Sequence, residues 1–385
     1  MSSNDVEPFE LHIEQPVLDD LKRRLEFVRW PDGETVEGWG QGVPIAQAQR
    51  LCDHWLSRYD WRRCEAQLNA FGQFRTELDG LKFHFLHVRS PSPDALPLVL
   101  THGWPGSVLE FAKVIRPLTD PAAHGGDPAD AFHLVIPSLP GYGFSERPRQ
   151  SGWTTDRVAG AWITLMRRLG YERFVAQGGD WGAFVTMNLA GLAPPELKAI
   201  HLNLATGGPD ASERERLTDD ERARLAGLER HRAEGRGYSE QQSTHPQALG
   251  YALADSAMGQ AAWIYEKYRE WSDCGDDPLS VFTLDEMLDN IMLYWLPGTG
   301  AASARLYWES FEASLEPQRA VATPVGCSIF PEETIRPSRH WAERHFSNII
   351  YWNEVERGGH FAAFEQPELF VRELRQCFRG VRTGL

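Results

Sequence analysis

One short polar turn, between an apolar run and a helix-like run, constrains this chain more than any other feature. Residues 173–176 (Arg-Phe-Val-Ala) predict a buried strand, and residues 183–190 predict the beginning of a helix. Between them lies the segment 178–182, Gly-Gly-Asp-Trp-Gly, with Asp180 at its centre. A strand, a sharp turn and a helix with a polar residue at the apex form the context of a nucleophile elbow. The neighbouring residues have to be small because such a turn is tight and strained.

An aspartate at this apex indicates a particular chemistry. The usual residue is serine, whereas a carboxylate in the same place attacks carbon and forms an ester with the substrate. Taken alone, the segment around Asp180 is equally compatible with an ordinary surface turn. The other segments of the chain have to decide between these two interpretations.

The apolar pattern divides the 385 residues into four expected units, of which the first covers residues 1–90. An amphipathic helix is predicted over residues 16–29, and a second helical stretch over about 45–68. Alternating runs on both sides of Asp79-Gly80 predict a β-hairpin, because Asp-Gly is a residue pair that two-residue hairpin turns prefer.

The second unit, residues 91–206, alternates short apolar strands with helical stretches, which predicts a parallel sheet with helices on its faces. This alternation stops over residues 207–319. There a capping box, Thr218-x-x-Glu221, opens a charged helix, and a further helix rich in aromatic residues is predicted over 252–271. We interpret this helical insert as a lid. The strand pattern resumes in the last unit, residues 320–385.

Charge and composition exclude several classes of function. A net charge of −15 argues against nucleic acid or an anionic membrane as a partner. No apolar run reaches the ~18 residues of a membrane span, and the polar N-terminus is unlike a signal peptide, so a cytoplasmic protein is expected. Five scattered cysteines form neither a disulfide framework nor a metal motif. The basic residues are mostly arginine, which is typical of a GC-rich bacterial genome.

A carboxylate nucleophile needs partners, and candidates stand in the expected strand context. The ester is hydrolysed through an oxyanion, which the backbone N–H groups of Trp181 and Trp104 are placed to stabilise. His360 lies in a glycine-rich loop after the last predicted strand and is the candidate base. An acid that orients this histidine is expected after the preceding strand, where Glu332 and Glu333 both qualify. The order nucleophile, acid, histidine is that of the α/β-hydrolases.

Other polar and aromatic residues in these segments are expected to be structural. His84 and His87 lie in the predicted hairpin, and His102 is expected to hydrogen-bond loop backbone. Trp153 and Phe361 suit an apolar pocket and the core equally well.

Taken together, the motifs resemble those of the microsomal-type epoxide hydrolases, a branch of the α/β-hydrolase superfamily. The resemblance lies in His-Gly-Trp-Pro-Gly at 102–106, Gly-Gly-Asp-Trp-Gly at 178–182, Arg-Gly-Gly-His-Phe-Ala-Ala-Phe-Glu at 357–365 and Arg-Trp-Pro at 29–31. It covers nearly the whole chain. It implies an α/β-hydrolase fold with a mostly parallel sheet, a helical lid insert and an N-terminal extension that wraps the core and clasps the lid.

The resemblance also implies roles for single residues. Asp180 would be the nucleophile and His360 the base, and the family pattern favours Glu333 as the acid. Two lid tyrosines would donate to the epoxide oxygen, and Tyr238 and Tyr307 match their sequence contexts. A phenol, with a pKa of ~10, can hydrogen-bond this oxygen and release a proton as charge develops there. The alternative, that either residue is merely a packed tyrosine, stays open.

The predicted reaction is conversion of an epoxide and water to a vicinal diol, with no cofactor and no metal. Membrane-bound members of the family carry a hydrophobic N-terminal anchor, which this sequence lacks, so no membrane partner is expected. A homo-oligomer is compatible with the sequence. Two other functions stay open: a haloalkane dehalogenase with the same Asp nucleophile, and a non-catalytic ligand-binding protein of this fold. A broad apolar pocket would suit an aryl or alkyl epoxide, and the arginine-rich chain would also suit a bacterial enzyme that acts on a natural-product epoxide.

Overall fold

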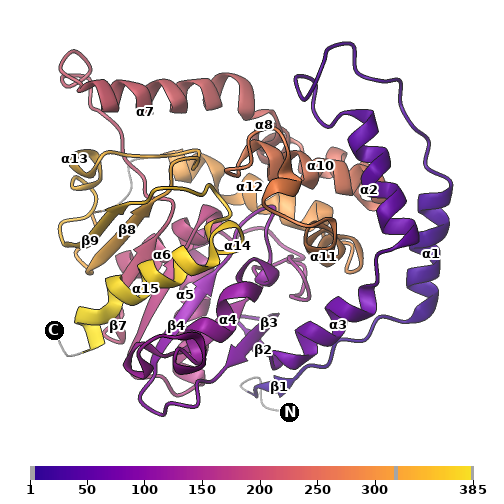
Figure 1. Cartoon of the computed structure of the whole chain (residues 1–385). Coiled ribbons are helices and arrows are strands. Elements are labelled where there is room, and N and C mark those ends of the chain that lie inside the picture. The colour runs from indigo at the N-terminus through magenta and orange to yellow at the C-terminus, as the bar shows by residue number, and fades with distance from the viewer. Residues whose placement is uncertain (1–4, 316–319, 383–385) are drawn as a thin grey trace.

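The computed structural model describes residues 5–315 and 320–382 (Figure 1). In these ranges the strands form one sheet in the order β1-β2-β3-β5-β4-β6-β7-β8-β9. The strands β5, β4, β6, β7, β8 and β9 run parallel to their neighbours. The remaining pairs, β1 with β2, β2 with β3 and β3 with β5, are antiparallel. The mostly parallel sheet is therefore confirmed. The strands are β1 (Glu7–Pro8), β2 (Gln73–Leu78), β3 (Leu81–Val88), β4 (Leu96–Thr101), β5 (Phe132–Pro137), β6 (Phe174–Gly178), β7 (Leu197–Leu202), β8 (Val325–Ile329) and β9 (Ile349–Glu354).

Helices cover both faces of the parallel part of the sheet (Figure 1). Helices α4 (Ala112–Thr119) and α15 (Pro367–Arg382) pack together on one face, and α5 (Thr155–Arg168) and α6 (Asp180–Leu192) pack together on the other. Strands β4 and β6 are buried along their whole length, as expected for parallel strands between two helical layers. The apolar residues of α15 recur every three or four positions and are buried: Phe370, Leu374, Phe378 and Val381.

The hairpin predicted around Asp79-Gly80 is confirmed. Leu78 pairs with Leu81, so the loop has two residues. Asp79 and Gly80 have φ values of 50° and 76°, which are the two positive φ values of a type I′ turn.

The N-terminal segment contributes three helices: α1 (Gln15–Glu26), α2 (Ile45–Ser57) and α3 (Trp61–Ala70). The prediction of one helical stretch over 45–68 is wrong at its middle, because the side chain of Asp60 accepts the N–H of Arg62 and begins a new helix. Helix α1 packs on α2 and α10, and α2 also packs on α10 and α11 (Figure 1). The N-terminal segment therefore contacts the helical insert directly.

The helical insert, described here over residues 207–315, holds most of the remaining helices. The capping box at Thr218 and Glu221 is confirmed. The helix predicted over 252–271 is two helices, because Ser256 leaves the helical conformation and caps a new helix through the N–H of Gly259. The predicted end of the insert at residue 319 lies outside the described residues. The helices are α7 (Asp219–Arg230), the π-helix η4 (His231–Gly235), α8 (Gly237–Thr244), α9 (Pro246–Asp255), α10 (Ala257–Glu270), α11 (Leu284–Trp295) and α12 (Gly300–Leu315).

Short helices complete the described part of the chain. None of its helices is long and apolar enough to cross a membrane. The five cysteines are buried and form no disulfide. The short helices are η1 (Val108–Phe111), η2 (Ala122–His124), η3 (Pro128–Asp130), η5 (Pro278–Ser280), α13 (Arg339–Ala342) and α14 (Ala362–Glu365).

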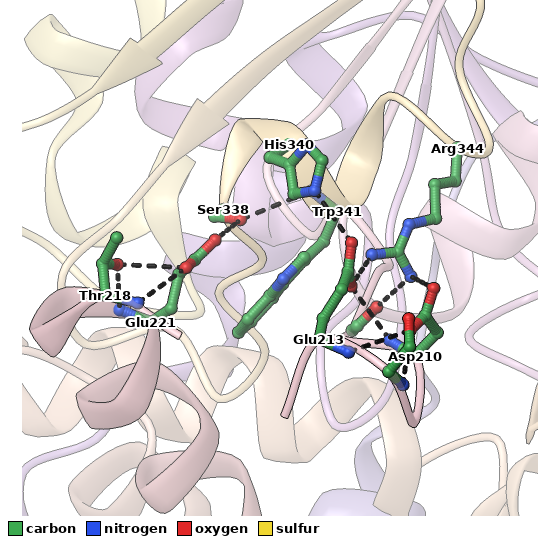
Figure 2. Close-up of polar contacts among 10 residues, drawn as sticks. Asp210, Glu213, Thr218, Glu221, Ser338, His340, Trp341 and Arg344 are labelled. Carbon is green, nitrogen blue, oxygen red and sulfur yellow. Dashed lines mark hydrogen bonds and ion pairs between the residues drawn. The ribbon is translucent and has the colours of Figure 1, made fainter. Parts of the chain in front are cut away.

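The beginning of the insert is fastened to the segment around α13 (Figure 2). Glu213 forms an ion pair with Arg344 and lies 2.9 Å from His340 Nε2. The Ser338 hydroxyl donates a 2.9 Å hydrogen bond to Glu221. We call this group the insert latch.

Candidate active site

Four loops at the carboxyl ends of β4, β6, β8 and β9 meet at one edge of the sheet. Trp104 follows β4, Asp180 follows β6, Glu333 follows β8 and His360 follows β9. The strands run parallel, so these ends lie at the same edge. The topology thus brings together residues that are far apart in the sequence.

Asp180 begins α6 in the left-handed conformation, with a φ of 48°. Non-glycine residues held in this region are strained and cluster at functional sites. The surroundings leave no room for side chains: a Cβ atom on Gly182 would lie 1.9 Å from the carbonyl oxygen of Thr101, and one on Gly103 would lie 2.1 Å from Asp180 Oδ1. The turn therefore holds the carboxylate directly against the loop after β4, with 18% of the side chain exposed.

The loop after β4 turns a backbone amide toward this carboxylate. The N–H of Trp104 donates a 2.7 Å hydrogen bond to Asp180 Oδ1. Helix α11 holds the loop: Asn290 donates to the carbonyl of Pro105 at 2.7 Å, and Tyr294 donates to the next carbonyl at 2.6 Å. The Trp104 amide is thus fixed where negative charge on the Asp180 carboxyl group would be stabilised.

Trp181, the second predicted oxyanion donor, is the second residue of α6. N–H groups in the first turn of a helix have no acceptor within the helix and lie at the positive end of its dipole. The indole of Trp181 is buried, and its Nε1 atom has no hydrogen-bond partner among the described residues. The backbone N–H of Trp181, directly after Asp180 in the chain, is therefore free of an acceptor within the helix.

His360 lies between two carboxylates. Its Nδ1 atom is 2.8 Å from Glu333 Oε1, and its Nε2 atom is 3.4 Å from Asp180 Oδ2. Glu333 is buried and also accepts hydrogen bonds from the N–H and hydroxyl of Thr334. Glu332 is exposed. Of the two glutamates that the sequence left open, Glu333 is therefore the one that contacts His360.

The two carboxylates control the charge of His360. Burial lowers the pKa of its imidazole, but the negative charges of Glu333 and Asp180 outweigh this effect and raise the pKa well above its ordinary value. The site without substrate therefore favours a protonated His360 beside Asp180.

Glu365 holds the loop that carries His360. The backbone N–H of His360 donates to the carbonyl of Trp271 at 2.8 Å. Burial raises the pKa of Glu365 to about 7, against the lowering effect of its backbone hydrogen bonds. These bonds measure 2.8–3.0 Å and come from the amides of Asp273, Gly359 and Phe361.

The two predicted tyrosines lie together next to Asp180. Tyr238 on α8 and Tyr307 on α12 have ring centroids 5.8 Å apart. The Tyr238 ring stacks on the indole of Trp104 at 5.1 Å, and Tyr307 stands edge-on to Trp181 at 4.8 Å. Burial raises the pKa of both phenols, and the Asp180 carboxylate adds to the rise. Both phenols are therefore protonated donors at neutral pH.

The hydroxyl of Tyr307 is a buried polar group that is not satisfied by a well-formed hydrogen bond. It is buried and meets the hydrogen-bond geometry with no described residue, although the Tyr238 phenol lies near enough for a weak hydrogen bond between the two to affect the pKa of both. A buried polar group without a partner costs about 1–3 kcal/mol, so such groups in native proteins call for an explanation. A ligand oxygen next to Asp180 would satisfy this donor.

A cavity of about 730 Å³ reaches this region from the helical insert. Tyr238, Trp271 and Glu333 line it, together with Lys267 and, from the N-terminal segment, Trp39. Asp180 lies beyond the residues that line this cavity. Within the described ranges, no group of three or more His, Cys, Asp or Glu side chains could hold a metal ion.

The three histidines predicted to be structural all have protein partners. Burial lowers the pKa of His84 to about 3 and of His87 and His102 to about 4. Each is thus neutral at pH 7. Their partners are Ser138 and Gln73 for His84, the Tyr171 hydroxyl for His87, and the Gly103 carbonyl and Leu139 amide for His102.

Comparison with known families and proteins identifies this arrangement. A family model described as "Epoxide hydrolase N terminus" matches residues 6–111, and one described as "alpha/beta hydrolase fold" matches residues 97–256. A Stigmatella aurantiaca protein named "Putative epoxide hydrolase" is 55% identical over 378 residues, which cover 98% of this chain and 86% of that protein. Epoxide hydrolase 1 of Sus scrofa is 34% identical over 404 residues, covering 98% and 89%. This chain belongs to the epoxide hydrolase family.

Solved epoxide hydrolases share the fold of this hydrolase. The juvenile hormone epoxide hydrolase of Bombyx mori superposes with a TM-score of 0.91 at 29% identity, over 98% of this chain and 95% of that one. The Aspergillus niger epoxide hydrolase superposes with a TM-score of 0.87 at 32% identity, over 98% and 97%. The α/β-hydrolase fold predicted from the sequence is therefore confirmed.

The hydrolase also has a buried acid that sequence reasoning missed. An oxygen of Glu110 lies 2.2 Å from where a Cβ atom on Gly106 would be, behind the loop that carries Trp104. Burial raises the pKa of Glu110 to about 8. The negative charge of Asp180 raises this pKa, whereas the positive charge of His360 lowers it. Glu110 is thus a neutral acid near the site at pH 7. Nothing in the sequence distinguishes it from an exposed glutamate in a short helix.

Proposed function

We propose that this hydrolase opens an epoxide through a covalent ester on Asp180 and then hydrolyses that ester to release a vicinal diol. The observation that carries the proposal is the position of His360, whose two ring nitrogens face Glu333 at 2.8 Å and Asp180 at 3.4 Å. A base held at this distance can activate a water for attack on an ester formed at Asp180.

In the first step the Asp180 carboxylate attacks one epoxide carbon, and the C–O bond on that carbon breaks. The epoxide oxygen takes a proton from the phenol of Tyr238 or Tyr307, which leaves a phenolate and a hydroxyalkyl ester. The proximity of both rings to Asp180, together with the unsatisfied hydroxyl of Tyr307, supports this assignment.

In the second step His360 removes a proton from water, and the resulting hydroxide adds to the ester carbonyl. The amides of Trp104 and Trp181 stabilise the oxyanion, as the 2.7 Å hydrogen bond from Trp104 to Asp180 suggests. Loss of the diol restores the Asp180 carboxylate. His360 is protonated before the reaction begins, so it first gives its proton to the phenolate once the ester has formed and only then takes one from water. It ends the cycle protonated, and the cycle consumes only epoxide and water.

A single turnover in ¹⁸O water tests this pathway. The label should enter the carboxyl group of Asp180, detected by peptide mass spectrometry, while the first diol stays unlabelled. Label that goes directly into the diol would mean that water attacks the epoxide without an ester.

The substrate proposed is an epoxide with apolar substituents. Aromatic rings surround the two phenols, because Tyr238 contacts Trp104 and Trp271 and Tyr307 contacts Trp181. The relative from Bombyx mori is named for juvenile hormone, so a panel of terpenoid, aryl and alkyl epoxides is the appropriate screen. We also propose that the helical insert acts as a lid over this site.

Haloalkane dehalogenation is the second candidate. The buried Nε1 of Trp181 has no partner among the described residues, and an indole N–H of this kind could bind a leaving halide. The paired phenols favour the epoxide instead. Halide release from chloroalkanes without diol formation from epoxides would reverse the choice, and tight ligand binding without any turnover would favour a non-catalytic protein.

A further inference from the structure

Lys267, on α10, is a buried cation that the proposed reaction does not use. Its side chain is 4% exposed, although lysine is almost never fully buried unless it is paired. Its Nζ atom lies 2.6 Å from a carboxylate oxygen of Glu270 and 2.9 Å from one of Glu266. Both glutamates are partly exposed and line the cavity that opens through the insert.

The other contacts of this ammonium group are with the rings next to the site. Nζ lies 4.8 Å from the ring centroid of Tyr238 and 5.5 Å from that of Trp271. Both distances are within the ~6 Å over which the face of an aromatic ring attracts a cation. Lys267 and Tyr238 therefore line the same cavity, and the ammonium group lies against the tyrosine ring.

The other groups around Tyr238 mostly oppose ionisation of its hydroxyl. Burial raises its pKa most, and the carboxylates of Asp180, Glu270 and Glu333 raise it further, whereas the Tyr307 phenol lowers it. A phenol that gives up its proton while the epoxide opens develops negative charge in these surroundings. A cation against its ring would offset that cost at the moment when the charge forms.

We propose that Lys267 is a positioning residue for Tyr238, whose ammonium group stabilises the phenolate formed as Tyr238 protonates the opening epoxide. The proton moves from the phenol oxygen to the epoxide oxygen while the C–O bond breaks, and Lys267 keeps all of its own protons. Glu266 and Glu270 hold the ammonium group in place. The inference rests on the proposed function, because it needs Tyr238 to be an acid.

The test separates the two chemical steps in the full-length protein. With an aryl epoxide that the parent protein converts as substrate, rapid-quench kinetics and intact-protein mass spectrometry follow the formation and the hydrolysis of the ester. Lys267→Met should slow ester formation roughly tenfold, the size expected of a desolvated cation facing a ring, and leave ester hydrolysis unchanged. Lys267→Arg keeps the positive charge and should recover most of the rate.

A double-mutant cycle with Tyr238→Phe distinguishes this role from a merely structural one. In the Tyr238→Phe background no phenolate can form on that ring, so Lys267→Met should have no further effect on ester formation. Circular dichroism and thermal unfolding check that each variant is folded.

Four results would overturn the inference. A structural role would be shown if Lys267→Met slowed both steps equally. It would also be shown if Lys267→Met slowed ester formation just as much in the Tyr238→Phe background. If Tyr238→Phe slowed ester formation and Lys267→Met did not, the role of Lys267 would be excluded and the proposed function would stand. Normal ester formation in Tyr238→Phe would instead remove Tyr238 as an acid, and the inference with it.

Discussion

The Nε2 atom of His360 lies 3.4 Å from Oδ2 of Asp180, so one imidazole faces both the proposed nucleophile and the water that would attack its ester. His360→Gln should therefore form the ester but hydrolyse it about 10²–10⁴-fold more slowly, the range that a positioned general base contributes. Intact-protein mass spectrometry should detect the accumulated ester. Asp180→Asn is the control and should gain no mass, whereas full turnover by the His360 variant would contradict its role.

A second prediction concerns the charge of His360. Its pKa in the folded protein is raised well above its usual value by Glu333 and Asp180, against the lowering effect of burial. Asp180→Asn removes one of these charges and should lower the pKa, which NMR titration of the imidazole can measure. Formation of an ester on Asp180 should lower it in the same way and free the base.

The same shift has a consequence for stability. Because the folded pKa lies above the unfolded value of ~6.5, the contacts of protonated His360 contribute stability that is fully present below pH ~6.5 and lost as the pH rises through the folded pKa. The difference in unfolding free energy between the parent protein and Asp180→Asn should therefore be larger at pH 6 than above the folded pKa. An unchanged imidazole pKa in the variant would contradict both statements.

Tyr307 allows function and stability to be separated. Its hydroxyl is buried without a partner, so Tyr307→Phe should raise the free energy of unfolding, by about 1 kcal/mol, while slowing ester formation. Tyr171→Phe is the matched control: it removes a hydroxyl 2.8 Å from His87 and should lower stability without affecting turnover. A destabilised Tyr307→Phe variant would show that this hydroxyl is already satisfied.

The sequence predicts those parts of this protein that depend on local rules. The Asp79-Gly80 turn formed because both residues tolerate positive φ. The elbow formed around Asp180 because Gly178 and Gly182 have no Cβ atom, which would lie within 2.0 Å of a backbone oxygen at either position. The missed boundaries lie at Asp60 and Ser256, where a single capping side chain ends one helix and begins another. The pattern of apolar residues continues across such a break and does not predict it.

Other features depend on tertiary packing, which no local pattern encodes. Glu332 and Glu333 are adjacent acids, and only the direction of the chain after β8 decides that Glu333 contacts His360. Lys267 and Glu110 look like surface charges in helical segments, and they become functional candidates only once α10 and the loop after β4 are packed against the site.

The next prediction compares Gly182 in the tight turn around Asp180 with Gly160 in a helix. Gly182→Ala would bring a Cβ atom within 1.9 Å of a backbone oxygen, which cannot move as a flexible side chain can. We expect a loss of at least about 3 kcal/mol in unfolding free energy, or no folded protein. Gly160→Ala, in α5, meets nothing within 4 Å and should instead stabilise by about 0.5–1 kcal/mol. Denaturant titration compares the two, and equal effects would contradict the packing argument.

The last prediction concerns the insert latch (Figure 2). Glu213 contacts both Arg344 and His340, so Glu213→Gln removes an ion pair with Arg344 and weakens the contact with His340 at the start of the insert. These groups are partly exposed, so global stability should fall by no more than about 1 kcal/mol, and less at high salt.

The effect of this substitution should instead be local. Backbone amides over 207–217 should exchange hydrogen faster in Glu213→Gln, because Glu213 links that segment to His340 and Arg344, while ester hydrolysis at Asp180 should be unaffected. Glu343→Gln removes an exposed pair with Arg339 within one short helical segment and is the control, with no change expected over 207–217. Exchange that is unchanged in the Glu213 variant would mean that packing of Leu217 and Trp341, both buried, holds the segment without the ion pairs.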